Sequence, residues 1–170
     1  MTRPRVDVRD GRVAPTSLVR GAGEVPAKRR NIVKYMILVY ASQKDYDGMV
    51  GKPTDKPAWS AEDAAAMQAF MQSFNKDLEE SGELVDTRGL TAPVHTRRFQ
   101  LQDGAPVVTD GPYAETQEVL AGYWIVECES FDRATEIAAR LGNCPAPDFV
   151  AANAYADIRP IADSVAELCV

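Results

Sequence analysis

Residues that usually build metal and disulfide sites are scarce in this chain. Among 170 residues there is one histidine, His95, and there are three cysteines, Cys128, Cys144 and Cys169. The cysteines are widely spaced and odd in number, so they form no CxxC pair and no spacing typical of a zinc site. This pattern favours a cytoplasmic protein, and we expect it to work without a metal or any other cofactor.

Long apolar runs are absent as well. No segment approaches the roughly 18 consecutive apolar residues of a membrane-spanning helix, and the N-terminus lacks the apolar central region of a signal peptide. Hydrophobic residues make up 45% and charged residues 26% of the chain, which is typical of a globular protein with one domain. We therefore expect no membrane partner.

The net charge of −6 is the sum of a basic N-terminal segment and an acidic remainder. Residues 1–32 hold eight basic and three acidic side chains, whereas residues 33–170 hold eleven basic and twenty-two acidic ones. Because an acidic body repels the phosphate backbone, we expect the folded domain to bind no nucleic acid.

Residues 1–32 are rich in Arg, Gly and Pro and show no hydrophobic period, so we expect a basic, disordered extension. Two other interpretations stay open. The extension could bind anions or nucleic acid through its positive charge. Alternatively, translation could start at a GTG codon at Val33, in which case residues 1–32 are not part of the protein.

From Val33 onward the apolar pattern predicts a folded domain over 33–162, followed by a tail or short helix at 163–170. Continuous or alternating apolar residues predict strands at 34–41, 83–90, 96–101, 106–109, 120–129 and 153–161. Residues 42–59 are polar and contain Gly and Pro, which predicts a long loop that is either mobile or functional.

Two amphipathic helices are predicted between these strands. Ser60 and Asp63 form a capping-box pattern, apolar residues from Met67 to Leu78 follow at helical spacing, and Ser81-Gly82 ends the helix. Ser130 begins the second helix. Its buried face is expected to carry Phe131, Ala134, Ile137, Ala138 and Leu141.

The order strand, helix, strand, hairpin, strand, helix, strand predicts an α+β fold, a ferredoxin-like two-layer sandwich with an inserted hairpin. Asp103-Gly104 is a strong signal for the hairpin turn. Helices can cover only one face of such a sheet. The other face must also be covered if it carries the apolar side chains of the two central strands. These are Tyr35, Ile37, Val39, Tyr123 and Ile125. We therefore expect a homodimer, a dimeric α+β barrel with a cleft between sheet and loops in each subunit.

The stretch TDGPYAETQEVLAGYW, residues 109–124, places a turn and three carboxylates just before an apolar and aromatic strand. Asp110 could act there as a general base or anchor a substrate. It could instead hold the Gly111-Pro112 turn by accepting backbone hydrogen bonds. Asp110 is the first catalytic candidate, and His95 is the second, because histidine is the residue type that most often serves as an acid or base in catalysis.

Candidates for ligand binding are Arg97, Tyr113, Glu115, Glu118, Tyr40 and Trp124. Only one of Arg97 and Arg98 can face the cleft, because strand side chains alternate, and a free arginine there would attract an anionic substrate. The aromatic side chains could line the pocket or only contribute packing. The two glutamates could equally be solvated surface carboxylates.

Four segments resemble the YCII-related family, and more narrowly its DGPF subgroup, over about residues 33–161: KYMILVY, DGPYAETQE, DRATEIAARL and ADIRPI. The resemblance implies the dimeric ferredoxin-like fold. The central motif has Tyr113 where the subgroup has Phe, and Gln117 where it has Lys. The wider family has a proposed histidine–aspartate pair with the histidine on the first helix. This chain has no histidine there, so that pair is not carried over.

Two functions of different classes follow. The first is a cofactor-free isomerase, lyase or dehalogenase acting on a small anionic or oxygenated molecule, with Asp110 moving a proton and Arg97 or Arg98 holding an anionic group. The second is a non-catalytic dimer that binds a metabolite or regulates a partner. The resemblance extends this second function to companions of extracytoplasmic-function sigma factors. Because one scaffold hosts many functions, the fold does not choose between them.

Overall fold

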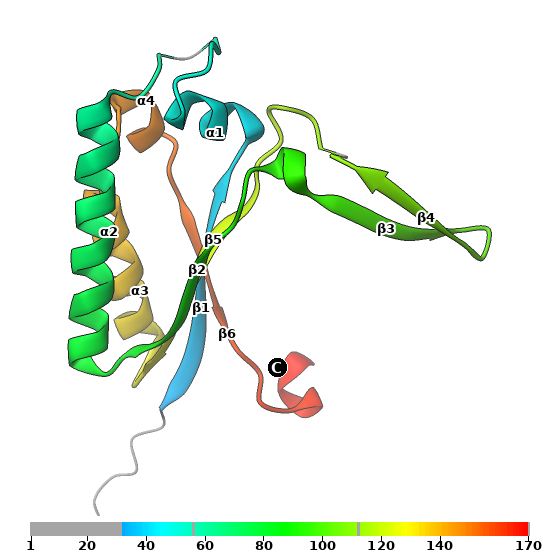
Figure 1. Cartoon of the computed structure of the whole chain (residues 1–170). Helices are drawn as coiled ribbons and strands as arrows, with labels where there is room; N and C mark the ends of the chain where they lie inside the picture. The colour runs from blue at the N-terminus through cyan, green and yellow to red at the C-terminus, as the bar shows by residue number, and fades with distance from the viewer. Residues whose placement is uncertain (1–31, 56, 112, 170) are drawn as a thin grey trace, which may run out of the picture.

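The computed structural model describes residues 32–55, 57–111 and 113–169. The expected N-terminal extension lies outside these residues, except for Ile32, and so does Pro112 of the central motif. The chain forms a mixed α+β fold with an antiparallel sheet (Figure 1). In the described ranges, no helix combines the length and the apolar character needed to cross a membrane.

Four strands form the main sheet in the spatial order β2-β5-β1-β6. They span Val33–Ala41 (β1), Leu84–Gly89 (β2), Val119–Cys128 (β5) and Ala156–Pro160 (β6). Each neighbouring pair is antiparallel. The two most apolar strands, β1 and β5, lie at the centre of the sheet. All four strands agree with the predicted segments to within a few residues at each end.

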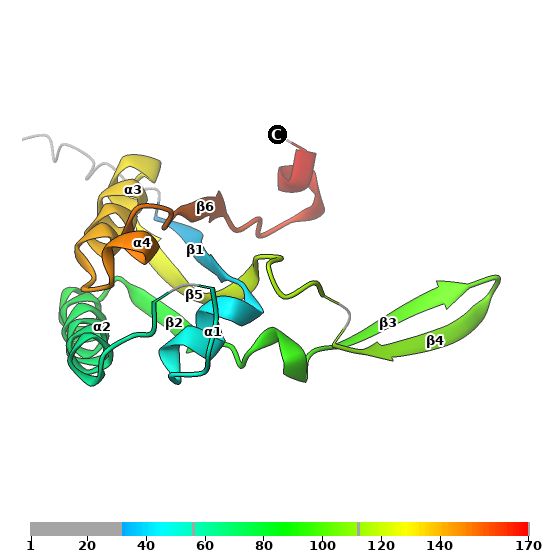
Figure 2. The same ribbon diagram turned by 90° about the horizontal axis from the view of Figure 1, so that it is seen from above.

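Two helices cover one face of this sheet, α2 (Ala61–Ser81) and α3 (Phe131–Arg140) (Figures 1 and 2). The Ser60 hydroxyl accepts a hydrogen bond from the Asp63 amide, and the Asp63 carboxylate accepts one from the Ser60 amide, each at 3.0 Å. The predicted capping box is thus confirmed. Gly82 ends α2 with a φ of 75°, a left-handed conformation that favours glycine.

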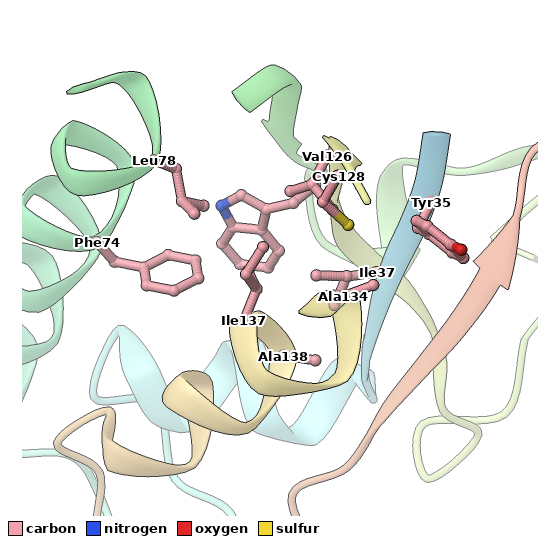
Figure 3. Close-up of a cluster of buried hydrophobic side chains, with 10 residues drawn as sticks. Tyr35, Ile37, Phe74, Leu78, Val126, Cys128, Ala134, Ile137 and Ala138 are labelled. Carbon is pink, nitrogen blue, oxygen red and sulfur yellow. The ribbon is translucent and has the colours of Figure 1, made fainter. Parts of the chain in front are cut away.

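The hydrophobic core is one layer of side chains between the helices and the sheet (Figure 3). Phe74 and Trp124 meet there edge to face, with ring centres 5.7 Å apart. Burying an aliphatic side chain completely contributes about 1.5–3 kcal/mol. The largest fully buried side chains come one each from β1, α2, β5 and α3, namely Ile37, Leu78, Val126 and Ile137. A single layer therefore joins all four elements.

The two faces of the sheet differ from the expectation. Tyr35, Ile37 and Val39 belong to or pack against the core under the helices, because alternate side chains of a strand point to the same side. The prediction that these three residues line the second face is therefore wrong. The side chains between them, and those opposite on β5, are half-buried on the face without helices: Met36, Leu38, Tyr123 and Ile125. We call this the open face.

The predicted hairpin is confirmed as a separate two-stranded sheet, formed by β3 (Arg97–Gln102) and β4 (Ala105–Asp110). Asp103 and Gly104 have φ values of 51° and 80°, and both are positive as a two-residue type I′ turn requires. Both views show the hairpin projecting from the body on the side opposite to α2 and α3 (Figures 1 and 2). We call residues 97–110 the arm.

The long loop expected at 42–59 contains a helix, α1 (Gln43–Met49). Its polar composition and Gly48 hide it from a search for apolar periodicity, but Ser42 and Asp45 form a second capping box. The remaining short elements are η1 (Pro93–His95), η2 (Leu141–Asn143), α4 (Asp148–Ala151) and η3 (Val165–Cys169). The last of them is a 3-10 helix within the segment 163–170, where we expect a tail or a short helix.

Candidate functional site

A cavity of about 430 Å³ lies at the root of the arm, where β3 begins and β4 ends. Its lining residues are Val94, His95, Thr96, Arg97 and Asp110. The structure therefore brings together both catalytic candidates and one of the ligand-binding candidates. The cavity opens widely to solvent, and four of its five lining residues are exposed; only Thr96 is half-buried. We call this the arm-root cavity.

The 3-10 turn η1 positions His95 at the cavity. Pro93 is buried and begins the turn, where its fixed φ is favourable. The His95 amide donates to the carbonyl oxygen of Ala92 at 2.9 Å. The Val94 amide donates to the side-chain oxygen of Gln43 at 2.8 Å, which ties η1 to helix α1. The exposed imidazole is thus carried on a turn that the body of the protein holds in place.

Gly111 fixes the other side of the arm root. Its amide donates to the carbonyl oxygen of Thr96 at 2.8 Å, and its φ of 54° lies in the left-handed region that favours glycine. This bond keeps the end of β4 directly beside the start of β3. Arg97 and Asp110 are consequently held opposite each other at the first rung of the arm.

Arg97 and Asp110 form an ion pair at the wall of the cavity. The Arg97 Nε–H donates to Asp110 Oδ1 at 2.7 Å, and this bond raises the pKa of Arg97 because the carboxylate stabilises the charged guanidinium. The side chains are 72% and 75% exposed, so the pair contributes little to stability. Among the described residues, no other hydrogen bond occupies the two amino groups of Arg97, which leaves them available to an anion.

Arg98 points to the other side of the arm. Its guanidinium carbon lies 4.7 Å from the centre of the Tyr113 ring, a distance at which a cation is attracted to the ring face. Tyr113 is half-buried beneath it and is not part of the arm-root cavity lining. The expected alternation is therefore observed, with Arg97 at the cavity and Arg98 packed on an aromatic ring.

The two glutamate candidates, Glu115 and Glu118, lie outside the cavity and have different hydrogen-bond partners. The backbone carbonyl of Glu115 accepts a hydrogen bond from the Lys44 amide at 3.2 Å, which joins the central motif to α1. Glu118 accepts a hydrogen bond from the Tyr155 hydroxyl, and this bond raises the pKa of Tyr155. In the part of the chain that the structure describes, no group of three or more His, Cys, Asp or Glu side chains is placed to hold a metal ion.

Tyr40 belongs to a second cluster at the β6 edge of the sheet. Its ring stacks on Tyr155 with centres 5.3 Å apart, and its hydroxyl donates to Asp157 at 2.9 Å. The bond to Asp157 raises the pKa of Tyr40 because it stabilises the protonated phenol. The ring and the hydroxyl of Tyr40 both have partners within this cluster. Tyr40 does not line the arm-root cavity.

Trp124 lies in the hydrophobic core, whereas the sequence predicts that it binds a ligand. It is only 6% exposed, and its indole N–H donates to Asn75 Oδ1 at 2.8 Å. The register sets Trp124 opposite Ile37, which turns its side chain toward the helices instead of toward a cleft. At this position the aromatic side chain of the central motif therefore packs in the hydrophobic core.

Tyrosine–aspartate pairs flank the apolar strip of the open face. The Tyr123 hydroxyl donates to Asp86 on β2 at 3.0 Å, which raises the pKa of Tyr123, and the pair of Tyr40 with Asp157 lies on the β6 side. Apolar side chains at the centre and polar ones at the rim are the pattern of a protein interface. The sequence did not indicate these aspartates, because they meet their tyrosines only through the strand pairing.

Together these observations define a mixed α+β domain with one open sheet face and a solvent-open hollow at the root of the arm. The family model of the YCII-related domain matches residues 33–161, so the chain belongs to the YCII-related family. An uncharacterised protein of Rhizobium meliloti (strain 1021) is 30% identical over 86 residues, which cover 51% of this chain and 69% of that protein. These similarities establish the family and specify no reaction.

Proposed function

We propose that this protein is a homodimer that binds a small anionic metabolite in the arm-root cavity. The observation that supports this most is the meeting of Arg97 and His95 at one hollow. The guanidinium offers a planar fork of donors for a carboxylate or phosphate group, and the imidazole offers another nitrogen donor. Asp110 pairs with Arg97, so an incoming anion would share the guanidinium with it and bind reversibly.

The proposal includes a finer assignment of fold and family. The strand order β2-β5-β1-β6, with both crossover helices on one face, supports a ferredoxin-like sandwich in which the arm is an inserted hairpin. The motif DGPYAETQE at 110–118 supports membership of the DGPF subgroup.

The open face supports the dimer. Two copies related by a two-fold axis can cover each other's apolar strips, with the two sheets packed about 10 Å apart. Met36 and Leu38 on β1 would then meet the equivalent residues of the second copy. This arrangement is a dimeric α+β barrel.

A specific observation favours a second candidate function, a cofactor-free enzyme of the isomerase, lyase or dehalogenase type. The His95 imidazole and the Asp110 carboxylate line the same cavity, and these are the residue types that transfer protons at neutral pH. Both are exposed, whereas catalytic acids and bases are usually desolvated. Binding without turnover therefore fits the exposed geometry better.

Calorimetric titration with small anions tests the binding function. The probes are acetate, benzoate and inorganic phosphate, and the variants are Arg97→Gln and the matched control Arg98→Gln. We expect at least one probe to bind wild type and Arg98→Gln equally, and to bind Arg97→Gln at least tenfold more weakly. Equal affinity for all three proteins, or no binding of any probe to wild type, contradicts the proposal.

Proton NMR of the protein mixed with a reactive small carboxylate, such as 2-chloropropionate, separates binding from catalysis, because acetate, benzoate and inorganic phosphate contain no bond that an isomerase, lyase or dehalogenase changes. Spectra of a bound probe that stay unchanged over hours support the binding function. Loss of probe signals in wild type, and their persistence in His95→Gln, would instead establish the enzyme. An Asp110→Asn variant then distinguishes a carboxylate that moves the proton from one that only orients Arg97.

A further inference from the structure

The arm has one apolar face, and this face continues from the arm-root cavity. The strand register places Phe99 opposite Val108 and Leu101 opposite Pro106. Because strand side chains alternate, these four share the side on which Arg97 and Asp110 stand. Phe99, Leu101 and Val108 are 63%, 67% and 55% exposed. The other face of the arm is mostly polar and carries Arg98, Gln100, Gln102, Ala105, Val107 and Thr109.

Nothing in the described part of the chain extends the arm into a larger sheet, since β3 and β4 pair only with each other there. A two-stranded hairpin alone is marginally stable in water. A projecting hairpin with large exposed apolar side chains on one face is therefore suited to packing against another protein surface.

The arm projects on the same side of the sheet as the open face. Figures 1 and 2 both show the arm standing on the side of the sheet away from the helices, as does the C-terminal turn η3. Any protein that covers the open face consequently lies beside the arm. The apolar strip of the sheet and the arm thus lie on the same side of the molecule, where one partner can contact both (Figures 1 and 2).

The length of the arm matches a second copy of this chain. Each strand of the arm has six residues, which extend about 20 Å at roughly 3.3 Å per residue. In a dimer with stacked sheets, the partner's sheet lies about 10 Å away. The arm therefore reaches past the partner's sheet, to the level of its helical layer.

The surface that a second copy would bury on the open face and the arm also bears on the choice of partner. The open face of four strands, about 4.8 Å apart and about 20 Å long, measures on the order of 400 Å². A stable complex buries about 800 Å² on each partner. The four apolar side chains of the arm add roughly 300 Å². The value for the sheet is a flat, projected area, and the arm adds exposed apolar surface that a second copy can bury.

We propose that the arm clasps a second copy of this chain through Phe99, Leu101, Pro106 and Val108, and that the clasped copy closes the arm-root cavity. This inference rests on the proposed homodimer. Since Arg97 and Asp110 stand on the clasping side, a partner that packs on the arm also excludes water from their ion pair. The ligand site is then complete only in the dimer.

Sedimentation equilibrium of the full chain tests the clasp. The arm variant is Phe99→Ser with Val108→Ser, and its matched control, Gln100→Ser with Thr109→Ser, changes the opposite face at neighbouring positions. We expect the arm variant to dimerise at least tenfold more weakly than wild type and the control to be unchanged. The far-UV circular dichroism of both should match wild type, because the arm lies outside the core.

A third variant separates the clasp from the dimer itself. Leu38→Asp places a charge at the centre of the open face and should give a monomer. If Leu38→Asp is monomeric and the arm variant dimerises like wild type, the clasp is overturned and the dimer stands. If wild type is monomeric at every concentration, both ideas fail, and the arm is left for a different protein partner.

Hydrogen exchange on wild type supplies a test that needs no variant. The amides of residues 99–108 should exchange at least tenfold more slowly at concentrations where the dimer forms than under dilution to monomer. Arm exchange rates that do not depend on protein concentration overturn the clasp. The arm variant should also bind the anion probe at least tenfold more weakly although Arg97 and His95 are intact, and unchanged binding contradicts closure of the cavity.

Discussion

Arg97 and Asp110 face each other across the first rung of the arm, with Nε and Oδ1 2.7 Å apart. The pair lines the same cavity as His95. One carboxylate therefore has two effects: it holds the guanidinium in place, and it competes with any anion that approaches. These effects can be separated by substitution.

Asp110→Asn should bind the anion probe severalfold more tightly than wild type, because the competing charge is removed while a polar side chain of the same shape remains. The melting temperature should change by no more than about 2 °C, since an exposed ion pair contributes little. Titration calorimetry and thermal denaturation measure the two quantities. Glu115→Gln, which neutralises an exposed carboxylate outside the cavity, serves as the control. A fall of more than about 5 °C for Asp110→Asn would make the residue a structural support of the strand entry.

The pH dependence of stability should report the ion pair of Glu83 with Arg133. Two bonds, of 2.7 and 2.8 Å, join the side chains, and the Glu83 carboxyl is only 17% exposed. These bonds lower the pKa of Glu83 in the folded state. A carboxyl with a lowered folded-state pKa stabilises the protein above its unfolded value of about 4.3, and this contribution is lost as pH falls through the folded-state pKa.

Glu83→Gln should therefore be less stable than wild type by about 1–3 kcal/mol at pH 7, and the difference should shrink steadily below about pH 4. Urea unfolding between pH 3 and pH 7 gives the measurement. The matched control is Glu80→Gln, whose exposed side chain pairs with Lys76 at 3.6 Å and should show almost no effect. A difference between wild type and Glu83→Gln that is constant with pH would exclude titration of this carboxyl as the cause.

Gly122→Ala should destabilise the sheet by about 1–3 kcal/mol. A Cβ at this position would lie 2.9 Å from the carbonyl oxygen of Arg88 on the neighbouring strand, and backbone cannot move aside cheaply. Gly142→Ala is the control, because nothing lies within 4 Å of a Cβ there. Chemical denaturation of both variants provides the comparison. Equal stability of the two would mean that β2 and β5 can separate freely at this rung.

Local signals in the sequence were enough to predict most of the elements. Ser60 with Asp63 marks the start of α2, and Asp103-Gly104 marks the turn of the arm. That turn also determines the register of the hairpin. A two-residue loop pairs Gln102 with Ala105 and, by counting back along both strands, Arg97 with Asp110. The central pair of the candidate site was therefore predictable from the sequence.

Other features depend on contacts between distant segments. The sequence predicts Tyr35, Ile37 and Val39 on the open face, whereas they lie under the helices. Strand β1 has apolar side chains on both faces, so its sequence does not reveal which face the helices cover. Trp124 was expected at a cleft for the same reason. The cluster of Tyr40, Tyr155 and Asp157 joins β1 to the region of β6, about 115 residues apart, and no local pattern marks it.

The most direct test of the account is a ¹⁵N-correlated NMR titration of the full chain with the tightest-binding anion probe. Chemical-shift changes should concentrate at the amides of residues 94–97 and 110–111, around the arm-root cavity. A rival site exists near Phe74, Asp77 and Arg140, where a second cavity of about 110 Å³ lies between the helices. Shifts concentrated there, or no shifts at residues 94–97, would contradict an anion site at the root of the arm.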